Sequence, residues 1–552
     1  MTGSRAADVF VRCLEAEGVR HVFGIPGEET LDLNRSLARS SIRFVPVRHE
    51  QGAAFVAGMY GRLTGRAGVC LGTLGPGALN LVTGVADAFL DRMPLVALTG
   101  QRPLDRMHKE SHQYVDLIEV MRPITKWNAR ASEPEIIPEV VRKAFRVAES
   151  EKPGATHLEL PEDVMAQPLD ATALPRRTPP LSDPGEREIE RAAELACTAT
   201  APLVLAGNGV LRAGAAPALR EFARATGIPV AETFMAKGAI DRADPLALGT
   251  VGLQERDYAL AGFDEADVVI AVGYDLVEHA PAHWNPRRDK SVVVIDSLPA
   301  EIDAYFTPAV ELLGDLDHVL RRLAETCRSR REPRPPVPRS RLRDLVDRRL
   351  EAGRGDDAFP VAPPRALCEL REALGPADVL VSDVGLHKLW IATMFAAHEP
   401  NTVLIANGLA AMGFALPGAI AAKLADPDRR VVAVCGDGGV LMNFQELETA
   451  MRLGTAFVTV VWEDRGFGSI ACKQRERFAG AHFGTEFTNP DLVRLAESFG
   501  MPAWRCDSAP DFGPRLRHAL GLDVPSLIVL PIDYSVDIAI SDELASETVI
   551  RA

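Results

Sequence analysis

The chain has 552 residues, of which 47% are hydrophobic and 25% are charged, as in ordinary globular proteins. At roughly 150 residues per domain, this length predicts three or four domains and excludes a single small binding module. The 61 Lys and Arg residues against 76 Asp and Glu residues give a formal charge of −15, which repels nucleic-acid phosphates and anionic lipids. We therefore expect neither nucleic acid nor a membrane as the main partner.

The N-terminal residues do not resemble a signal peptide, because charged side chains interrupt what would be its apolar core. No window reaches the ~18 uninterrupted apolar residues that a membrane-spanning helix needs. The eight cysteines are scattered and include no C-x-x-C pair, so a zinc site is not predicted. These features predict a cytoplasmic location.

Two Pro-rich, basic stretches, residues 171–186 and 327–341, lack apolar periodicity and are typical of linkers. They divide the chain into three predicted domains, residues 1–170, 187–326 and 342–552. In each domain short β-branched runs alternate with longer helical patterns, which predicts βαβ units. The predicted fold class is therefore α/β, with three domains whose central, mostly parallel sheets are flanked by helices.

The expected elements can be placed most clearly in the first and third domains. In the first domain they are a strand at 44–50, a helix at 51–65, a strand and turn at 68–77 and a helix at 78–91. In the third domain they are buried strands at 379–385, 402–408, 431–438 and 456–464. The residues do not show whether these two domains share a fold. Ligands of open parallel sheets bind outside the carboxyl ends of the strands, so we expect the functional site there.

Two acidic residues follow successive expected strands of the third domain. The run Gly436-Asp437-Gly438-Gly439 follows one strand, and Asp464 ends the next. Strands joined by a βαβ crossover are commonly neighbours, so Asp437 and Asp464 are expected to lie close together. Mg²⁺ usually takes one or two carboxylates together with phosphate oxygens, so the pair predicts a magnesium and phosphate site. Taken alone, the glycine-rich run is also typical of a turn, and Asp464 of a helix N-cap.

The spacing of Asp437 and Asp464 resembles the diphosphate and magnesium motif of thiamine diphosphate (ThDP) enzymes. The run RHEQGAA at 48–54 resembles the motif around the glutamate that activates the cofactor in that superfamily, with Glu50 in its place. Alone, Glu50 is equally typical of a helix start. The run LGPGALN at 74–80 and the glycine-rich metal motif favour the functional interpretation.

The resemblance covers nearly the whole chain and is most specific to the acetolactate synthase family. It is carried by the segments 23–27, 49–55, 73–77, 98–101, 123–126, 383–387 and 407–414. It implies a pyrimidine-binding first domain, a non-catalytic middle domain and a diphosphate-binding third domain, with ThDP and Mg²⁺ as cofactors. It also implies a homodimer or homotetramer whose active sites are shared between two chains. The implied reaction decarboxylates pyruvate and adds the acetaldehyde unit to a second 2-oxoacid, giving 2-acetolactate.

Carried over position by position, the resemblance implies roles for five polar or metal-binding positions. Asp437 and Asp464 would bind Mg²⁺ through their carboxylates, and Gly466 through its carbonyl. Glu50 would activate the cofactor, and Gln113 would lie near the bound intermediate. An exposed loop amide is the alternative interpretation of Gln113.

The remaining implied residues would contact ThDP. Met412 would support the bent cofactor conformation, although simple core packing explains a methionine equally well. Ala410 would offer its carbonyl to the 4′-amino group of the cofactor. The other implied cofactor-binding residues are Pro26, Gly27, Gly75, Pro76, Gly77, Asn80, His387, Gly436, Gly438, Gly439, Phe467 and Gly468.

The middle domain departs from the FAD-containing biosynthetic members of the family. These carry Arg-Phe-Asp-Asp after a strand-ending glycine, where this chain reads GYDLVEH at 273–279 and lacks the arginine. The segment resembles that of the FAD-free catabolic members, as does aspartate at position 464. The glycines at 207–209 fit a dinucleotide fingerprint only loosely. FAD is therefore not expected.

A second departure concerns the second 2-oxoacid. Ser469 and Lys473 stand where biosynthetic members place a methionine and a tryptophan that shape the acceptor pocket. Lys473 is interpreted either as a surface charge or as a group that attracts the carboxylate of an anionic acceptor. The identity of the acceptor substrate is therefore left open.

Other functions also remain open from the residues alone. A ThDP enzyme with another donor or acceptor is one, as in carboxyethylarginine-synthase-like, sulfoacetaldehyde-type or 2-oxoacid decarboxylase enzymes, and a catalytically silent regulatory homologue is another. The lack of an adjacent His-His pair disfavours a simple decarboxylase, and the presence of Glu50, Asp437 and Asp464 disfavours a silent homologue. A nicotinamide-dependent dehydrogenase would need a convincing G-x-G-x-x-G, which the middle domain lacks.

Overall fold

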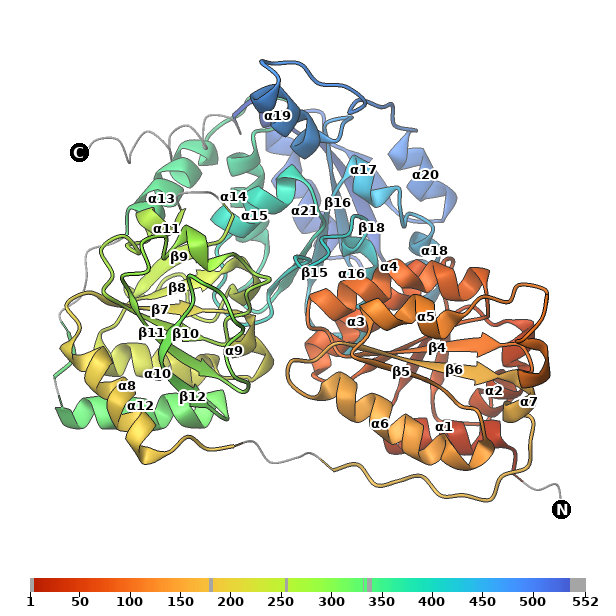
Figure 1. Ribbon diagram of the computed structural model, residues 1–552. Helices are drawn as coiled ribbons and strands as arrows, with labels where there is room; N and C mark the ends of the chain where they lie inside the picture. The colour runs from red at the N-terminus through yellow and green to blue at the C-terminus, as the bar shows by residue number, and fades with distance from the viewer. Residues whose placement is uncertain (1–3, 178–181, 254–256, 331, 335–339, 537–552) are drawn as a thin grey trace.

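Three helix-covered sheets follow one another along the chain (Figure 1). The computed structural model describes residues 4–177, 182–253, 257–330, 332–334 and 340–536. Each sheet has six strands, and all of its neighbouring strands run parallel. The predicted α/β class with three sheet domains is confirmed. Within these ranges no helix combines the length and the apolar character needed to cross a membrane.

The first sheet is buried on both faces by helices. Its strands, in spatial order, are β2 (Arg43–Pro46), β1 (His21–Gly24), β3 (Gly68–Gly72), β4 (Leu95–Gln101), β6 (Ala155–Pro161) and β5 (Trp127–Arg130). In β3, Val69 and Leu71 share a core with α1 (Ala6–Ala16) and α6 (Ile137–Glu149). Cys70 between them belongs to the core formed by α3 (Glu50–Thr64) and α4 (Pro76–Leu90). A strand covered on both faces is apolar at every position, which explains the continuous apolar run.

The middle sheet has the strand order of doubly wound dinucleotide-binding folds. Its strands, in spatial order, are β12 (Pro308–Leu313), β11 (Ser291–Asp296), β10 (Val268–Val272), β7 (Pro202–Ala206), β8 (Val230–Thr233) and β9 (Ala247–Val251). The helices α8 (Glu186–Thr198), α10 (Ala216–Thr226) and α12 (Leu316–Arg330) contribute to one of its cores. The order changes direction between β7 and β10, where such folds take their ligand.

The third sheet repeats the connectivity of the first. Its strands, in spatial order, are β14 (Val403–Ile405), β13 (Val379–Ser382), β15 (Val431–Gly436), β16 (Val458–Glu463), β18 (Ser526–Pro531) and β17 (Ala503–Arg505). Numbered within its own domain, each of the two sheets has the order 2-1-3-4-6-5. The first and third domains therefore share a topology that their residues did not show.

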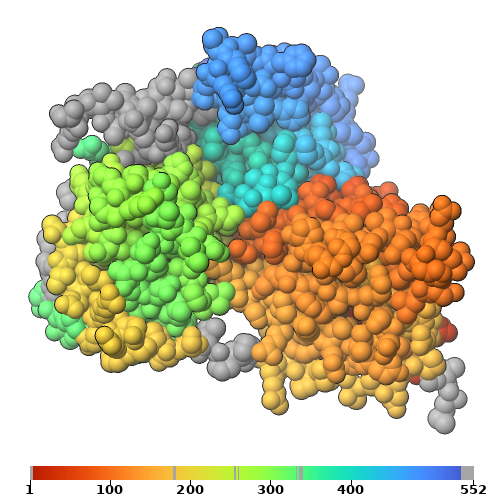
Figure 2. Space-filling model, in the orientation of Figure 1, coloured from red at the N-terminus to blue at the C-terminus, as the bar shows by residue number. Residues whose placement is uncertain are grey.

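The first and third domains pack directly on each other through α3 and α16 (Ala415–Ala425). Phe55 of α3 meets the edge of Phe414, with ring centroids 5.8 Å apart and an interplanar angle of 89°. Buried residues of both domains join in one apolar core. In the space-filling view the C-terminal part of the chain, cyan to blue, rests on the red and orange N-terminal domain (Figure 2).

The element boundaries differ from the expectation at the point where function was predicted. The strand expected over 44–50 ends at Pro46, and Glu50 is the first residue of α3 instead of a strand end. His49 is the N-cap of α3, since its side chain accepts a hydrogen bond from the N–H of Gln51 at 3.1 Å. The apolar Val47 fits the alternation of a strand, which is why the strand was expected to continue. The strand ends at Pro46 instead, and the N-cap at His49 starts the helix.

Candidate active site

The strand pairing brings Asp437 and Asp464 to the same edge of the third sheet. Strands β15 and β16 are neighbours, with Gly436 opposite Trp462. Asp437 is the first residue of α17 (Asp437–Val440), and Asp464 directly follows β16. Burial, followed by the nearby charge of Asp437, raises the pKa of Asp464 to about 7. The predicted proximity of the two carboxylates is confirmed.

The Asp437 carboxylate is held by three hydrogen-bond donors. Its Oδ2 accepts from the N–H of Arg465 at 2.7 Å and from Nδ2 of Asn489 at 2.8 Å. Its Oδ1 accepts from the N–H of Gly438 at 2.9 Å. In the described ranges no cluster of three or more His, Cys, Asp or Glu side chains could hold a metal. Two carboxylates are nevertheless enough for Mg²⁺ when phosphate oxygens complete the coordination.

Both carboxylates line a cavity of about 320 Å³. Three helices begin at this cavity, namely α15 (Leu386–Met394), α17 and α19 (Gly468–Arg477). Helix N-termini present free N–H groups and favour negative charge. The predicted residues that line it are His387, Met412, Gly436, Asp437, Gly438, Gly439, Asp464, Gly466, Phe467 and Gly468.

The lining suits a diphosphate group. His387 Nε2 is buried and has no hydrogen-bond partner among the described residues. Burial lowers the pKa of His387 to about 3, so the imidazole is neutral, and it donates to an anion when its one N–H is on Nε2. A Cβ added at Gly468 would lie 2.7 Å from Asp464 Oδ2, so glycine leaves the room that this carboxylate occupies. The chain thus supplies donors and space for an anion beside two carboxylates that could hold its cation.

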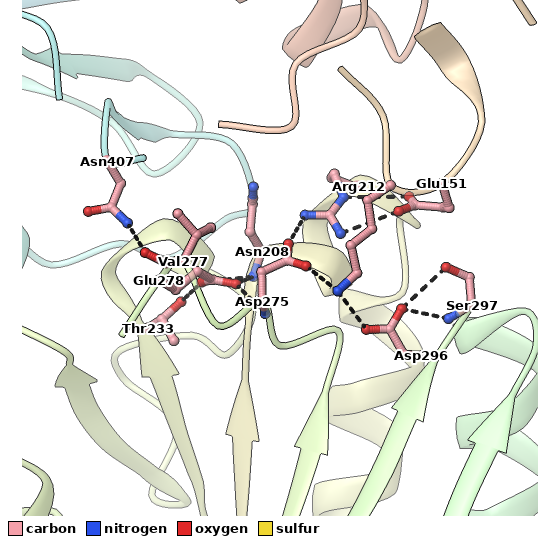
Figure 3. Close-up of polar contacts among 11 residues, drawn as sticks. Glu151, Asn208, Arg212, Thr233, Asp275, Val277, Glu278, Asp296, Ser297 and Asn407 are labelled. Atoms are coloured by element: carbon pink, nitrogen blue, oxygen red, sulfur yellow. Dashed lines mark hydrogen bonds and ion pairs between the residues drawn. The ribbon is translucent and has the colours of Figure 1, made fainter. Parts of the chain in front are cut away.

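The cavity also contains residues that the sequence did not single out. Phe234 and Leu253 enter it from the middle domain, and Lys388 and Asn407 from the third. Asn407 joins the three domains, because its N–H donates to Asp91 of α4 at 3.0 Å and its Nδ2 donates to the carbonyl of Val277 at 3.1 Å (Figure 3). Asn407 lies in the segment 407–414 that carries the family resemblance, whereas no motif marks the other three, which meet at the cavity through the packing of distant segments.

The N-terminal residues form a second group, around Glu50. Glu50 is buried, and its Oε2 accepts from Nδ2 of Asn80 at 3.0 Å. A Cβ added at Gly77 would lie 3.1 Å from Glu50 Oε1. At Gly75, where φ is +49°, an added Cβ would lie 2.4 Å from the carbonyl oxygen of Gln113. Glu50 is thus approached by Asn80 and Gly77, and Gln113 is approached by Gly75. The Gln113 side chain is exposed.

Backbone conformation or close packing describes the remaining predicted residues, which are Pro26, Gly27, Pro76 and Ala410. Gly27 packs so closely on Thr73 that an added Cβ would lie 2.3 Å from that side chain, and Pro26 precedes it. Pro76 is the first residue of α4, a position that suits proline. Ala410 has φ of +55° and does not line the cavity. Within one chain the N-terminal group and the cavity group are therefore separate sets.

Ser469 and Lys473, which stand where biosynthetic members place acceptor-pocket residues, lie about one turn apart on α19. Ser469 lines the cavity, whereas Lys473 is exposed and does not. The structure of one chain therefore agrees with the interpretation of Lys473 as a surface charge.

Family models and relatives agree with this arrangement. The model of the thiamine pyrophosphate enzyme N-terminal domain matches residues 4–120, that of the central domain 189–323 and that of the C-terminal domain 383–530. The fold and the site thus define a ThDP-dependent enzyme.

Curated relatives give the branch within this class. The catabolic acetolactate synthase of Raoultella terrigena is 35% identical over 96% of this chain and 95% of its own length. The acetolactate synthase of Bacillus subtilis is 34% identical over 99% and 96%. The chloroplastic acetolactate synthase 1 of Nicotiana tabacum is 33% identical over 95% and 81%. The chain belongs to the acetolactate synthase family of thiamine diphosphate-dependent enzymes.

Proposed function

We propose that this protein is a Mg²⁺-dependent carboligase that decarboxylates pyruvate and joins the two-carbon unit to a second 2-oxoacid, giving 2-acetolactate. The observation that carries the proposal is one cavity that combines Asp437 and Asp464 with the orphaned His387 Nε2 and three helix N-termini. The relatives named above are acetolactate synthases. A cytoplasmic location remains a prediction.

The side chains of the cavity would hold and orient the cofactor. Asp437 and Asp464 would bind Mg²⁺ through their carboxylates, with the carbonyl of Gly466, and His387 would donate to the diphosphate. When bound, ThDP supplies the electron sink that takes up the electron pair left by departing CO₂. Met412 and Phe467 add apolar surface to the same cavity.

Glu50 would hold the proton that is exchanged with the aminopyrimidine ring. It is the first residue of α3. Asn80 fixes its orientation through the bond to Oε2 and leaves Oε1 beside Gly77. The cavity of one chain contains no N-terminal-domain residue among its lining, which supports a homodimer or homotetramer in which a partner chain brings its own Glu50.

We also propose that the protein works without FAD. The loops after β7 and β10 are in direct contact, because the N–H of Gly209 donates to the carbonyl of Gly273 at 2.8 Å. At the start of α9 (Asn208–Arg212), Glu278 Oε1 accepts the N–H of Asn208 at 3.0 Å (Figure 3). A dinucleotide fold places its pyrophosphate at this helix start.

Further charges fill the same edge of the middle sheet. Arg212 Nη1 lies 2.8 Å from Asp275 Oδ2, and Lys152 Nζ lies 2.6 Å from Asp275 Oδ1. Arg212 also pairs with Glu151 of the first domain (Figure 3). We expect the freshly purified protein to show no flavin absorption and to be fully active without added FAD. Stoichiometric flavin in the purified protein would contradict this.

Product analysis by NMR tests the main proposal. Pyruvate with ThDP and Mg²⁺ should give 2-acetolactate, and omission of ThDP should abolish the product. Glu50→Gln should lower kcat at least 100-fold, since general acid–base groups contribute about 10²–10⁴-fold. Unconsumed pyruvate with bound ThDP would instead indicate another donor or a silent homologue, and retained activity in Glu50→Gln would refute the proposed role of this carboxylate.

A further inference from the structure

Asp437 is held by a side chain that lies outside every motif considered above. Asn489 follows it by 52 positions and lies in the loop before α20 (Leu492–Ser498). Its Nδ2 is 2.8 Å from Asp437 Oδ2 and 3.3 Å from Glu463 Oε1. Both neighbours are carboxylates, so the amide must present its nitrogen to them.

Glu463 is itself held in place. It is the last residue of β16, is almost fully buried and pairs with Arg505 at the end of β17. Arg505 pairs with Glu463 Oε2, and the other oxygen, Oε1, accepts from Asn489. A continuous series of polar contacts therefore links Arg505, Glu463, Asn489 and Asp437. We call this series the Asn489 relay.

The relay determines which way the Asp437 carboxylate faces. Asp437 is only 1% exposed, and a buried carboxylate takes the orientation that its donors impose. Two of its three donors are backbone N–H groups, of Gly438 and Arg465. Asn489 is the side-chain donor, so the orientation depends on the identity of residue 489.

We propose that Asn489 is a positioning residue that holds the Asp437 carboxylate in the orientation that binds a divalent cation. The inference rests on the proposed function, because it needs a cation at Asp437. Side chains behind a metal ligand typically change metal affinity 10–100-fold when they are replaced. A purely structural role would instead lower stability and leave the cation affinity of the folded protein unchanged.

The test is a calorimetric titration of Mg²⁺ into the full-length protein at saturating ThDP. Asn489→Leu keeps the approximate size and removes the amide, and we expect the Kd for Mg²⁺ to rise 10–100-fold. Asn489→Gln keeps an amide and should recover part of the affinity. The matched control is Asn285→Leu, which removes a buried amide that donates to the carbonyl of Tyr305 at 2.8 Å in the middle domain. Its Kd for Mg²⁺ should equal that of the wild type.

The outcomes separate the inference from the proposed function. If the wild-type protein binds no Mg²⁺ in the presence of ThDP, the proposed function is refuted. The inference then loses its basis as well. Wild-type Mg²⁺ binding together with an unchanged Kd in folded Asn489→Leu would overturn the inference alone. If Asn489→Leu does not fold, Asn489→Ser serves instead, because its hydroxyl is too short to reach both carboxylates, and the same rise is expected.

Discussion

Asp383 shows how one buried side chain can organise a site without touching the substrate. It follows β13, and its Oδ1 accepts the N–H of Val384 at 2.7 Å and that of Gly413 at 3.0 Å. The second bond fixes the loop that carries Met412. A Cβ added at Gly439 would lie 3.0 Å from Asp383 Oδ2, so the same carboxylate also packs against the glycine-rich run at 436–439. Burial raises the pKa of Asp383 to about 7.

His157 provides a pH-dependent test at the same scale. It is fully buried in β6, with Nε2 2.8 Å from Thr99 Oγ1, and burial lowers its pKa to about 3. An unfolded histidine titrates near 6.5, so the unfolded chain binds a proton that the folded chain excludes between these values. The contribution of His157 to stability is therefore complete above about pH 6.5 and is lost as the pH falls, by at most about 1.4 kcal/mol per pH unit.

Urea unfolding at pH 7 and pH 5 measures this effect. We expect the wild-type protein to lose about 1–2 kcal/mol more between these values than His157→Gln, which has no group that titrates there. Equal losses in the two proteins would show that the pH dependence arises elsewhere.

At the scale of elements, helix α3 shows both what the sequence could predict and what it could not. The apolar run over 51–65 predicted a helix, and α3 covers Glu50–Thr64. Gly65 is the left-handed C-cap of this helix, whereas Gly58 and Gly61 lie inside it and face neighbouring elements. At Gly61 an added Cβ would lie 2.1 Å from the carbonyl oxygen of Pro94, just before β4. At Gly58 it would meet only side-chain atoms, the nearest at 3.4 Å.

This difference predicts opposite outcomes for two substitutions on one helix. Gly61→Ala should destabilise the protein by about 1–3 kcal/mol, because α3 must move away from the backbone beneath it. Gly58→Ala should change the stability by less than about 1 kcal/mol, since the gain in helix propensity offsets a slight crowding. Thermal unfolding of both variants beside the wild type measures the difference. Similar effects would mean that the contact at Pro94 relaxes without cost.

The sequence predicted the features of the candidate site that depend on neighbouring strands, and it missed those that depend on contacts between distant segments. The pair Asp437 and Asp464 was predicted correctly, because adjacent parallel strands bring their carboxyl ends together. Asn489, Phe234 and Leu253 were missed, because they reach the site from distant segments and other domains. The strand end expected at Glu50 was wrong, and the helix start that the sequence offered as the alternative is the one observed, with a capping contact at His49.

At the scale of the whole molecule, the N-terminal group around Glu50 and the cavity around Asp437 are separate within one chain. If a partner chain completes each site, two different inactive variants should complement each other. We expect Glu50→Gln and Asp437→Asn to be inactive as homo-oligomers. A heterodimer of the two has one site with both substitutions and one with neither, and should therefore recover about half of the wild-type activity.

Co-expression with two different affinity tags and sequential purification yields this heterodimer. An inactive heterodimer that still binds ThDP would show that each site is completed within a single chain, contrary to the proposal.

The repeated strand order of the first and third sheets has a further consequence. Helix α3 follows β2, the edge strand of the first sheet, and α16 follows β14, the matching edge strand of the third. The two helices that pack against each other inside the chain are therefore counterparts, as they would be at an isologous contact between identical subunits. If two such chains assemble, they bring together four domains of this one topology, and a contact between two such domains already exists within each chain.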